Sequence, residues 1–340
     1  MPELPEVETV CRGLKKALLG DSIAQVNVLR KDSIASPVPK EFAKLLLGHH
    51  FVDVRRRGKY ILIDLDNQAG LVCHLRMSGR FLVVPANTAH GKFLRVHMTL
   101  KSGRELHFED MRVFGRLWYV PSGAQFEKIV PALQKLGVEP LPQLTATQLE
   151  SAFKNRKQSV KSALLDQTLV AGVGNIYADE SLFRAGIHPA SAAGALKPVH
   201  LTRLADTIVQ VLDNAITLGG STLSDYKTVE GMNGNYQHQA WVYGRTGEDC
   251  RTCGKKIERI KIGGRSSHYC PTCQTRMGAK SKTATQTDSQ AKQKPTRTAA
   301  QKVAKAAVKQ TPKAKPKPKA KLKPKAKPKP NSTPKRNQSA

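Results

Sequence analysis

The sequence predicts an α+β fold: an N-terminal β-sandwich with flanking helices, a C-terminal helical domain, a small metal-bound β-hairpin and a disordered basic tail. Three observations lead to this prediction. Strand-like alternation fills residues 23–120, helical spacing dominates residues 145–218, and two Cys-x-x-Cys pairs follow between residues 250 and 273. Beyond the last pair the composition narrows to Lys, Ala, Pro, Thr and Gln, which cannot build a packed core.

The first domain is expected to span residues 1–140. Apolar residues at helical spacing predict a helix over residues 5–19, with Gly20 as its stop. A second helix is expected near residues 41–47. The clearest predicted strands are residues 60–65, 71–75, 93–98 and 117–120.

A helical domain is expected over residues 141–247, after the linker Pro140-Leu141-Pro142. Thr145 and Gln148 have the spacing of a capping box, which opens a helix. The strongest predicted helices are residues 176–185 and 201–218. Residues 219–247 are rich in Gly, Asn, Gln and Tyr, so we expect them to form a mobile loop.

Four cysteines form two Cys-x-x-Cys pairs with sixteen residues between them. This spacing is typical of four-thiolate zinc sites and disfavours the alternative, a redox pair of dithiols. The ligands would be Cys250, Cys253, Cys270 and Cys273. An alternating run, a Gly-Gly turn and a returning run predict a β-hairpin over residues 248–277, with Arg265 at its tip. Four thiolates leave no open position, so we expect one structural Zn²⁺ and no catalytic metal.

Positive charge dominates the chain, whose formal net charge is +30. Residues 278–340 hold 19 Lys and Arg against one Asp, and residues 1–277 hold 37 against 25 acidic residues. This balance favours a polyanionic partner such as DNA. No apolar run reaches the ~18 residues of a membrane span, and no signal-peptide core opens the chain. We therefore expect no membrane partner and a cytoplasmic, nucleoid-associated location.

The first six residues, MPELPE, carry candidate chemistry. Removal of Met1 would expose the secondary amine of Pro2, which can attack an aldehyde-like carbon and form an imine-type intermediate. Glu3 and Glu6 are close enough in sequence to move protons. Taken alone, the same residues favour an ordinary helix start.

A glycine-rich loop, residues 171–176, precedes a predicted helix. Glycines at a helix N-terminus offer backbone N–H groups to a phosphate. Lys161 adds charge nearby in sequence, although a solvated helix lysine is an equal alternative. No predicted strand feeds the loop and no third glycine follows at dinucleotide spacing, so we expect no nucleotide cofactor.

Six sequence blocks, in this order, closely resemble those of bacterial formamidopyrimidine-DNA glycosylases, the MutM family. They are PELPEVET (2–9), RGKY (57–60), HLRMSG (74–79), DMRVFG (110–115), GVGNIY (172–177) and VYGR (242–245). The resemblance covers residues 2–276, including the four-cysteine hairpin, and leaves out the tail. It implies a helical domain of the helix–two-turn–helix type in a monomer. It also implies excision of 8-oxoguanine and formamidopyrimidines from DNA, followed by strand cutting through β,δ-elimination.

The resemblance also implies roles for single residues. Pro2 matches the nucleophile at the sugar C1′, Glu3 the proton donor to the opening sugar, and Glu6 a supporting carboxylate. Lys59, which alone suggests a turn residue, matches a lysine at the lesion phosphates, and we group it and Arg265 with the catalytic residues. The residues that match DNA-backbone contacts are His74, Lys161, Asn175, Tyr243 and Arg265. In the family, three side chains fill the space that the flipped nucleotide leaves, and the matching residues here are Met77, Arg112 and Phe114.

Two other functions stay open. The sister enzyme endonuclease VIII removes oxidised pyrimidines, but it typically starts Pro-Glu-Gly-Pro-Glu, so Leu4 argues against it. A noncatalytic zinc-hairpin protein would bind DNA without covalent trapping. One departure from the family is Ser221-Thr222, where we expect Thr-Thr at the start of the loop over the damaged base. The tail is either a loose phosphate-binding arm or a solvated solubility segment.

Overall fold

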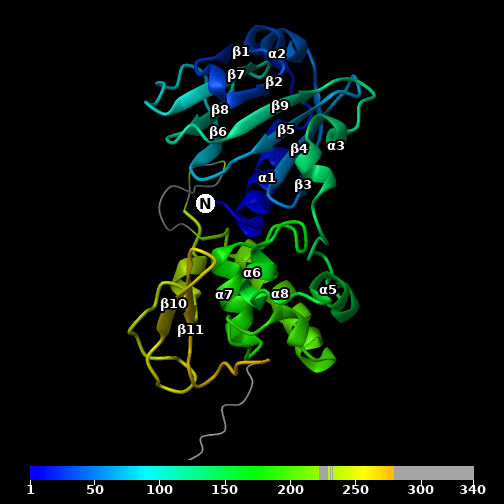
Figure 1. Cartoon of the computed structure of the whole chain (residues 1–340). Helices are drawn as coiled ribbons and strands as arrows, with labels where there is room; N and C mark the ends of the chain where they lie inside the picture. Colours follow the sequence, from blue (N-terminus) through cyan, green and yellow to red (C-terminus); the bar gives the residue numbers. More distant parts are fainter. Residues whose placement is uncertain (222–228, 230, 232, 279–340) are drawn as a thin grey trace, which may run out of the picture. The chain divides into compact units, whose positions relative to one another are not determined.

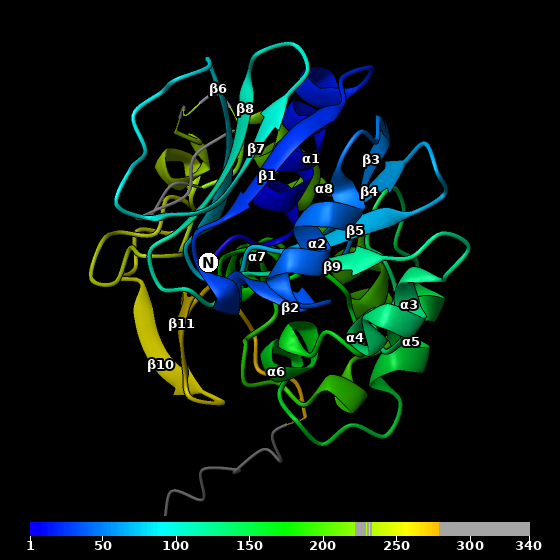
Figure 2. The same cartoon turned by 90° about the horizontal axis from the view of Figure 1, so that it is seen from above.

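The computed structural model describes residues 1–221, 229, 231 and 233–278 (Figures 1 and 2). The tail predicted to be disordered therefore lies almost wholly outside the described residues. The loop predicted over residues 219–247 lies partly outside them. Both remain predictions.

Two β-sheets make up most of the N-terminal part of the chain, coloured blue to cyan-green in Figure 1. Their strand orders are β1-β7-β8-β6 and β2-β9-β5-β4-β3. The first sheet consists of β1 (Ile23–Val28), β7 (Leu94–Leu100), β8 (Glu105–Asp110) and β6 (Gly79–Val84). The second consists of β2 (Ile34–Ser36), β9 (Arg116–Val120), β5 (Gly70–His74), β4 (Tyr60–Leu65) and β3 (Phe51–Arg57). The four strands predicted most clearly are all present, and their ends differ from the prediction by at most two residues.

Helix α1 (Leu4–Leu18) supplies the core of this part of the chain. Its buried face, which includes Val7, Leu14 and Leu18, joins one apolar cluster with residues of both sheets. The predicted start at residue 5 is close, because Glu3 is the N-cap and Pro5 falls in the first turn. Helix α2 (Pro39–Leu46) confirms the second predicted helix.

Helices dominate the next part of the chain. They are α3 (Phe126–Ile129), α4 (Pro131–Gln134), α5 (Ala146–Phe153), α6 (Val160–Leu165), α7 (Asn175–Arg184) and α8 (Pro198–Thr217). The Thr145–Gln148 capping box is present and opens α5. Helix α8 confirms the helix predicted over residues 201–218, and α7 packs against it. Its buried apolar face includes Leu201, Leu204, Ile208 and Val211. No helix among the described residues is long and apolar enough to cross a membrane.

The predicted hairpin forms from β10 (Glu258–Ile262) and β11 (Arg265–Tyr269). Ile262 pairs with Arg265, so Gly263 and Gly264 make the two-residue turn. Both glycines have positive φ, which such a turn needs. The hairpin contacts α7 along β11.

Candidate active site and DNA-contacting residues

The carboxylate of Glu3 is buried against the first turn of α7. Its Oε1 accepts the N–H of Ile176 at 3.1 Å, and its Oε2 accepts that of Tyr177 at 3.5 Å. A Cβ on Gly174, the N-cap of α7, would overlap this carboxylate, so only glycine permits the approach. The glycine loop, which was predicted to hold a phosphate, holds a carboxylate of the chain itself at the positive end of a helix, and its phosphate binding stays a prediction.

The carboxylate of Glu6 ties together three segments that are distant in sequence. It accepts the backbone N–H of Glu3 at 2.8 Å and that of Ser221 at 2.7 Å. The Tyr177 hydroxyl donates to the same oxygen that Ser221 contacts. Glu6 is 1% exposed. Its contacts therefore position the first residues of the chain and the start of the loop that begins at residue 219.

Lys59 lies in the turn between β3 and β4 and is 7% exposed. The turn is fixed by Glu139, whose Oε1 accepts from Arg57 at 2.8 Å and from the Gly58 N–H. Burial lowers the pKa of the Lys59 ammonium, and Arg265 lowers it further, while Glu3 opposes both. The hairpin tip, the turn and the N-terminal segment thus act on one another electrostatically.

The same environment prepares Glu3 to hold a proton. Burial is the largest cause that raises the pKa of Glu3, and the nearby Glu6 raises it further. Lys59 and the N–H groups of α7 oppose this rise. A carboxyl group with a raised pKa can stay protonated closer to neutral pH and can act as a proton donor.

His74, the last residue of β5, has a neutral imidazole ring that can donate one hydrogen bond. Burial is the main cause that lowers its pKa to about 3, and Arg76 and Lys59 add to the effect. Its Nδ1 accepts the backbone N–H of Arg76 at 3.0 Å, so the ring hydrogen lies on Nε2. The Tyr60 ring packs edge-on against the imidazole, with 4.5 Å between centroids. The outward nitrogen is therefore fixed as a hydrogen-bond donor.

Two exposed loops share one buried anchor, Asp110. Its Oδ1 accepts from the Ser78 hydroxyl at 2.5 Å and from the Arg112 N–H at 3.2 Å. Its Oδ2 accepts from the Gly115 N–H at 2.7 Å. The loops carry Met77, which is 37% exposed, and Phe114, which is 54% exposed. Asp110 thus holds the segments of Met77, Arg112 and Phe114 in one place while their side chains face outward.

A second buried carboxylate, Asp179 on α7, organises the hairpin. It accepts from the Lys161 Nζ at 2.6 Å and from the N–H of His268 at 2.9 Å. Lys161 also donates to the Ser266 carbonyl, and its side chain has no exposed surface. This lysine is therefore not a solvated helix residue, and it braces the strand that begins at Arg265. Asn175 donates to the same Ser266 carbonyl at 3.1 Å.

Glu180, beside Asp179, fixes the segment that carries Tyr243. Its carboxylate accepts the backbone N–H groups of Trp241, Val242 and Tyr243 at 2.8–2.9 Å. Tyr243 then packs against His268, and its hydroxyl lies 3.5 Å from the Asn175 amide. Asp110, Glu139, Asp179 and Glu180 were not predicted as site residues. Each of them has at least one partner far away in the sequence, and such a pairing leaves no signal in a motif.

The four cysteines gather as a zinc site requires. All four Sγ atoms lie within 4.8 Å of one another, with Cys250 and Cys273 at 3.9 Å and Cys253 and Cys270 at 3.4 Å. Zn–S bonds of ~2.3 Å in a tetrahedron put sulfurs about 3.8 Å apart, so the cluster fits one ion with four thiolate ligands.

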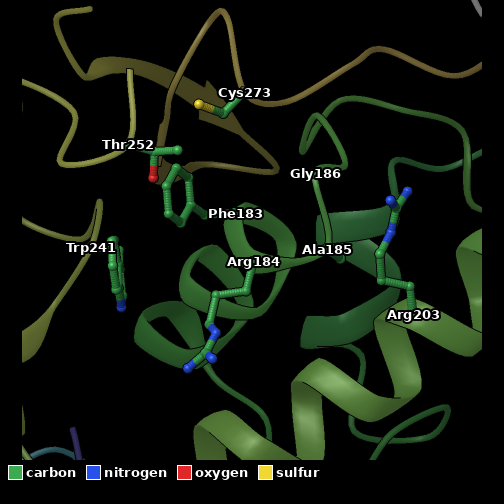
Figure 3. A pocket seen from close by; sticks show the side chains of 8 residues that line it. All are labelled: Phe183, Arg184, Ala185, Gly186, Arg203, Trp241, Thr252 and Cys273. Atoms are coloured by element: carbon green, nitrogen blue, oxygen red, sulfur yellow. The ribbon is translucent and has the colours of Figure 1, made fainter. Parts of the chain in front are cut away.

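A cavity of about 350 Å³ lies beside this zinc site (Figure 3). Phe183 and Trp241 stack with centroids 5.9 Å apart at its wall, and Arg184 lines the same space. Its lining includes Cys273 and none of the predicted catalytic residues. This cavity is therefore separate from the carboxylates at the start of α7.

Three protein families match the chain. Residues 1–117 match the formamidopyrimidine-DNA glycosylase N-terminal domain and residues 136–227 the formamidopyrimidine-DNA glycosylase H2TH domain. Residues 247–276 match the zinc finger found in FPG and IleRS.

Relatives and solved structures agree with these matches. Formamidopyrimidine-DNA glycosylases of Gloeobacter violaceus and a Synechococcus species are 50% and 47% identical. Each alignment covers 81% of this chain and 98% or 99% of the relative. A Lactococcus lactis FPG mutant bound to Fapy-dG DNA is 34% identical, with a TM-score of 0.75, over 81% of this chain and 100% of that one. MutM bound to carbocyclic 8-oxo-G DNA has 34% identity and a TM-score of 0.74 over the same shares.

Proposed function

The chain belongs to the formamidopyrimidine-DNA glycosylase family, and on that premise we propose how its residues act. It is a DNA glycosylase for oxidised purines that also has the family's AP-lyase activity. Its partner is damaged DNA, it is a monomer, and its four cysteines hold one structural Zn²⁺. The resemblance also supports a cytoplasmic enzyme that works on the nucleoid.

The proposed reaction starts at the Pro2 nitrogen after removal of Met1. The nitrogen bonds to the sugar C1′ and loses its proton, while the glycosidic bond breaks and the base leaves with the electron pair. Glu3 gives its proton to the sugar ring oxygen as the ring opens, which leaves an iminium between Pro2 and C1′. The iminium acidifies the C2′ hydrogen, whose removal expels the 3′ phosphate. A second elimination expels the 5′ phosphate.

One observation supports this scheme most strongly: Glu3, the residue after Pro2, has its carboxyl group buried at the start of α7, where its pKa is raised. Pro2 is itself buried, so the amine would be partly shielded from water. Glu6 contacts backbone and Tyr177 groups and serves as a positioning residue in this proposal. Lys59 is near enough to Glu3 to influence its pKa and supplies positive charge for the lesion phosphates.

The DNA contacts are proposed from the same geometry. His74 would donate from Nε2 to a phosphate, and Arg265 would reach a phosphate from the hairpin tip. Asn175 and Tyr243 would line the backbone path, with Lys161 bracing the strand behind Arg265. The space left by a flipped nucleotide would be filled by Met77, Arg112 and Phe114.

Borohydride trapping tests the proposal. The mature chain is incubated with an 8-oxoguanine duplex and borohydride, and the covalent adduct is measured by gel shift and mass. We expect an adduct on Pro2, and none from a chain with Met1 retained or an N-terminal tag. Binding without an adduct would favour the noncatalytic DNA-binding function. Faster excision from oxidised-pyrimidine duplexes than from 8-oxoguanine duplexes would favour the endonuclease VIII type.

A further inference from the structure

A cluster of three histidines and one glutamate lies on the sheet β1-β7-β8-β6, apart from the residues of the proposed reaction. His97 stands on β7, directly opposite His107 on β8, and Glu105 precedes His107 by two residues. Because side chains alternate across a strand, these three project to one face. Their neighbours Val96, Met98, Leu106 and Phe108 project to the other face and join the apolar core.

The potential ligand atoms of the cluster converge. Glu105 Oε2 lies 2.6 Å from His107 Nε2 and 3.8 Å from His97 Nδ1. His90, on the segment between β6 and β7, brings its Nε2 to 3.8 Å from the same oxygen. One ligand atom from each residue lies within 4.8 Å of all the others. A four-coordinate ion with bonds of ~2.0–2.2 Å would draw these atoms to about 3.4 Å from one another.

His97 gives the cluster an unsatisfied polar atom. Its side chain is about nine-tenths buried, yet Nδ1 has no hydrogen-bond partner among the described residues. A buried nitrogen without a partner costs free energy unless an unseen group satisfies it. The Glu105 carboxylate lies 3.8 Å from this nitrogen, which is too far for a hydrogen bond. A cation bound by His97 Nδ1 and by this carboxylate would give the buried nitrogen a partner.

We propose that His90, His97, Glu105 and His107 bind one divalent transition-metal ion of the zinc class, additional to the ion held by the cysteines. Imidazole nitrogens with one carboxylate suit Zn²⁺, Ni²⁺ or Cu²⁺ and do not suit Mg²⁺ or Ca²⁺, which take oxygen ligands. The cluster borders an open hollow of about 670 Å³, which gives an ion a path from solvent. The ion would fasten the His90 segment to two strands and would have no part in catalysis.

The test counts zinc ions in the untagged full chain. Native mass spectrometry after equilibration with micromolar zinc should find two ions per chain, and one in His90→Ala and in His97→Ala. His90 is exposed on a connecting segment, so its loss does not endanger the fold. His50→Ala, an exposed histidine outside the cluster, is the matched control and should keep two ions. A single ion in the native chain, or two in both cluster variants, would overturn the proposal.

Cobalt substitution identifies which site each ion occupies. Co²⁺ bound to thiolates gives intense sulfur-to-metal charge-transfer absorption, whereas Co²⁺ bound to imidazoles and a carboxylate gives only weaker d–d bands. The His90→Ala variant should lose d–d intensity and keep the full charge-transfer band. Zinc should raise the Tm of the native chain above that of His90→Ala, and single-turnover excision rates should be equal. Loss of charge-transfer intensity in His90→Ala would mean that the variant affects the cysteine site, and the proposal would fail.

Discussion

The residues proposed to act in the reaction are buried, whereas the residues proposed to fill the space left by the flipped nucleotide are exposed. Glu3, Glu6 and Lys59 are 3%, 1% and 7% exposed, and burial shifts the pKa of each of them. Met77 and Phe114 project outward from loops, at 37% and 54% exposed. The first set needs a dry environment to tune proton affinity, whereas the second needs open space into which DNA can enter.

Both sets nevertheless depend on buried carboxylates for their positions. Glu6 holds the N-terminal segment through the backbone N–H of Glu3. Asp110 holds the Phe114 loop through backbone N–H groups and the Met77 loop through the Ser78 hydroxyl. The two sets therefore differ in the exposure of their side chains, but both are held in place by a buried carboxylate. Substitutions can separate these two contributions.

Replacing Glu3 by Gln should have the largest effect. The amide oxygen of Gln can accept the Ile176 N–H, but Gln cannot donate a carboxyl proton, so base release should fall on the order of 10²–10⁴-fold. Cutting at a preformed abasic site should fall much less, because the base has already left. Single-turnover kinetics on 8-oxoguanine and abasic duplexes measure both. An equal loss in the two assays would contradict the role of Glu3 in base release.

Replacing Asp110 by Asn should have the second-largest effect on excision, because one oxygen that accepts hydrogen bonds from the loops is replaced by an NH2 group. Excision from duplex DNA should slow on the order of tenfold to a hundredfold. Phe114→Ala, which removes a wedge and leaves the support intact, should cost on the order of tenfold. Excision from single-stranded lesion DNA is the control. If Asp110→Asn is harmless while Phe114→Ala is not, Asp110 does not position these loops.

Glu3→Gln should also stabilise the fold at neutral and alkaline pH. Burial raises the pKa of Glu3 above its unfolded value, so the folded chain pays to ionise it as the pH rises. This cost is absent below the unfolded pKa and complete above the folded pKa. The Tm of Glu3→Gln should therefore exceed that of the native chain by about 2–4 °C at pH 8. This Tm difference should vanish near pH 4. Calorimetry at several pH values measures it, and a Tm difference that grows toward acidic pH would contradict the prediction.

Truncation after residue 278 should have the smallest effect on chemistry. The removed residues carry most of the chain's excess positive charge, so the salt dependence of DNA binding should flatten by roughly 0.9 for each lost phosphate contact. The excision rate on bound substrate should not change. Binding titrations at several salt concentrations compare the two chains. Identical slopes would identify the tail as a solubility segment.

Local patterns predicted most of the fold. The capping box at Thr145, the buried face of α8 and the Gly263-Gly264 turn all follow from residues close in sequence, and all are present. Pairing and support were harder to predict. In the order β1-β7-β8-β6, β1 (Ile23–Val28) pairs with β7 (Leu94–Leu100), which is far along the chain. Glu180 accepts hydrogen bonds from backbone N–H groups more than 60 residues away. Because every residue except proline has such a group, the sequence does not indicate which ones Glu180 contacts.

The candidate site could be predicted only where its residues stand in motifs. The N-terminal block and the cysteine pairs are such motifs. The roles of Pro2, Glu3 and Glu6 in the N-terminal block remain predictions. The burial of Lys161 against Asp179 could not be foreseen, since a helical lysine is usually solvated. The histidine cluster carried a weak signal, because His97, Glu105 and His107 occupy alternating positions of two strands. Only the strand pairing brings them together.

The contacts of Glu3 and Glu6 have a consequence for biosynthesis. The first residues to leave the ribosome find their partners in Tyr177 and Ser221, 174 and 215 positions later. At ~5–20 residues per second, the N-terminus waits roughly 10–40 s before its binding surface exists. An aminopeptidase can remove Met1 throughout that interval, while the end of the chain is still unstructured. The Pro2 nitrogen, the proposed nucleophile, would thus be unmasked before the residues that bury it are made.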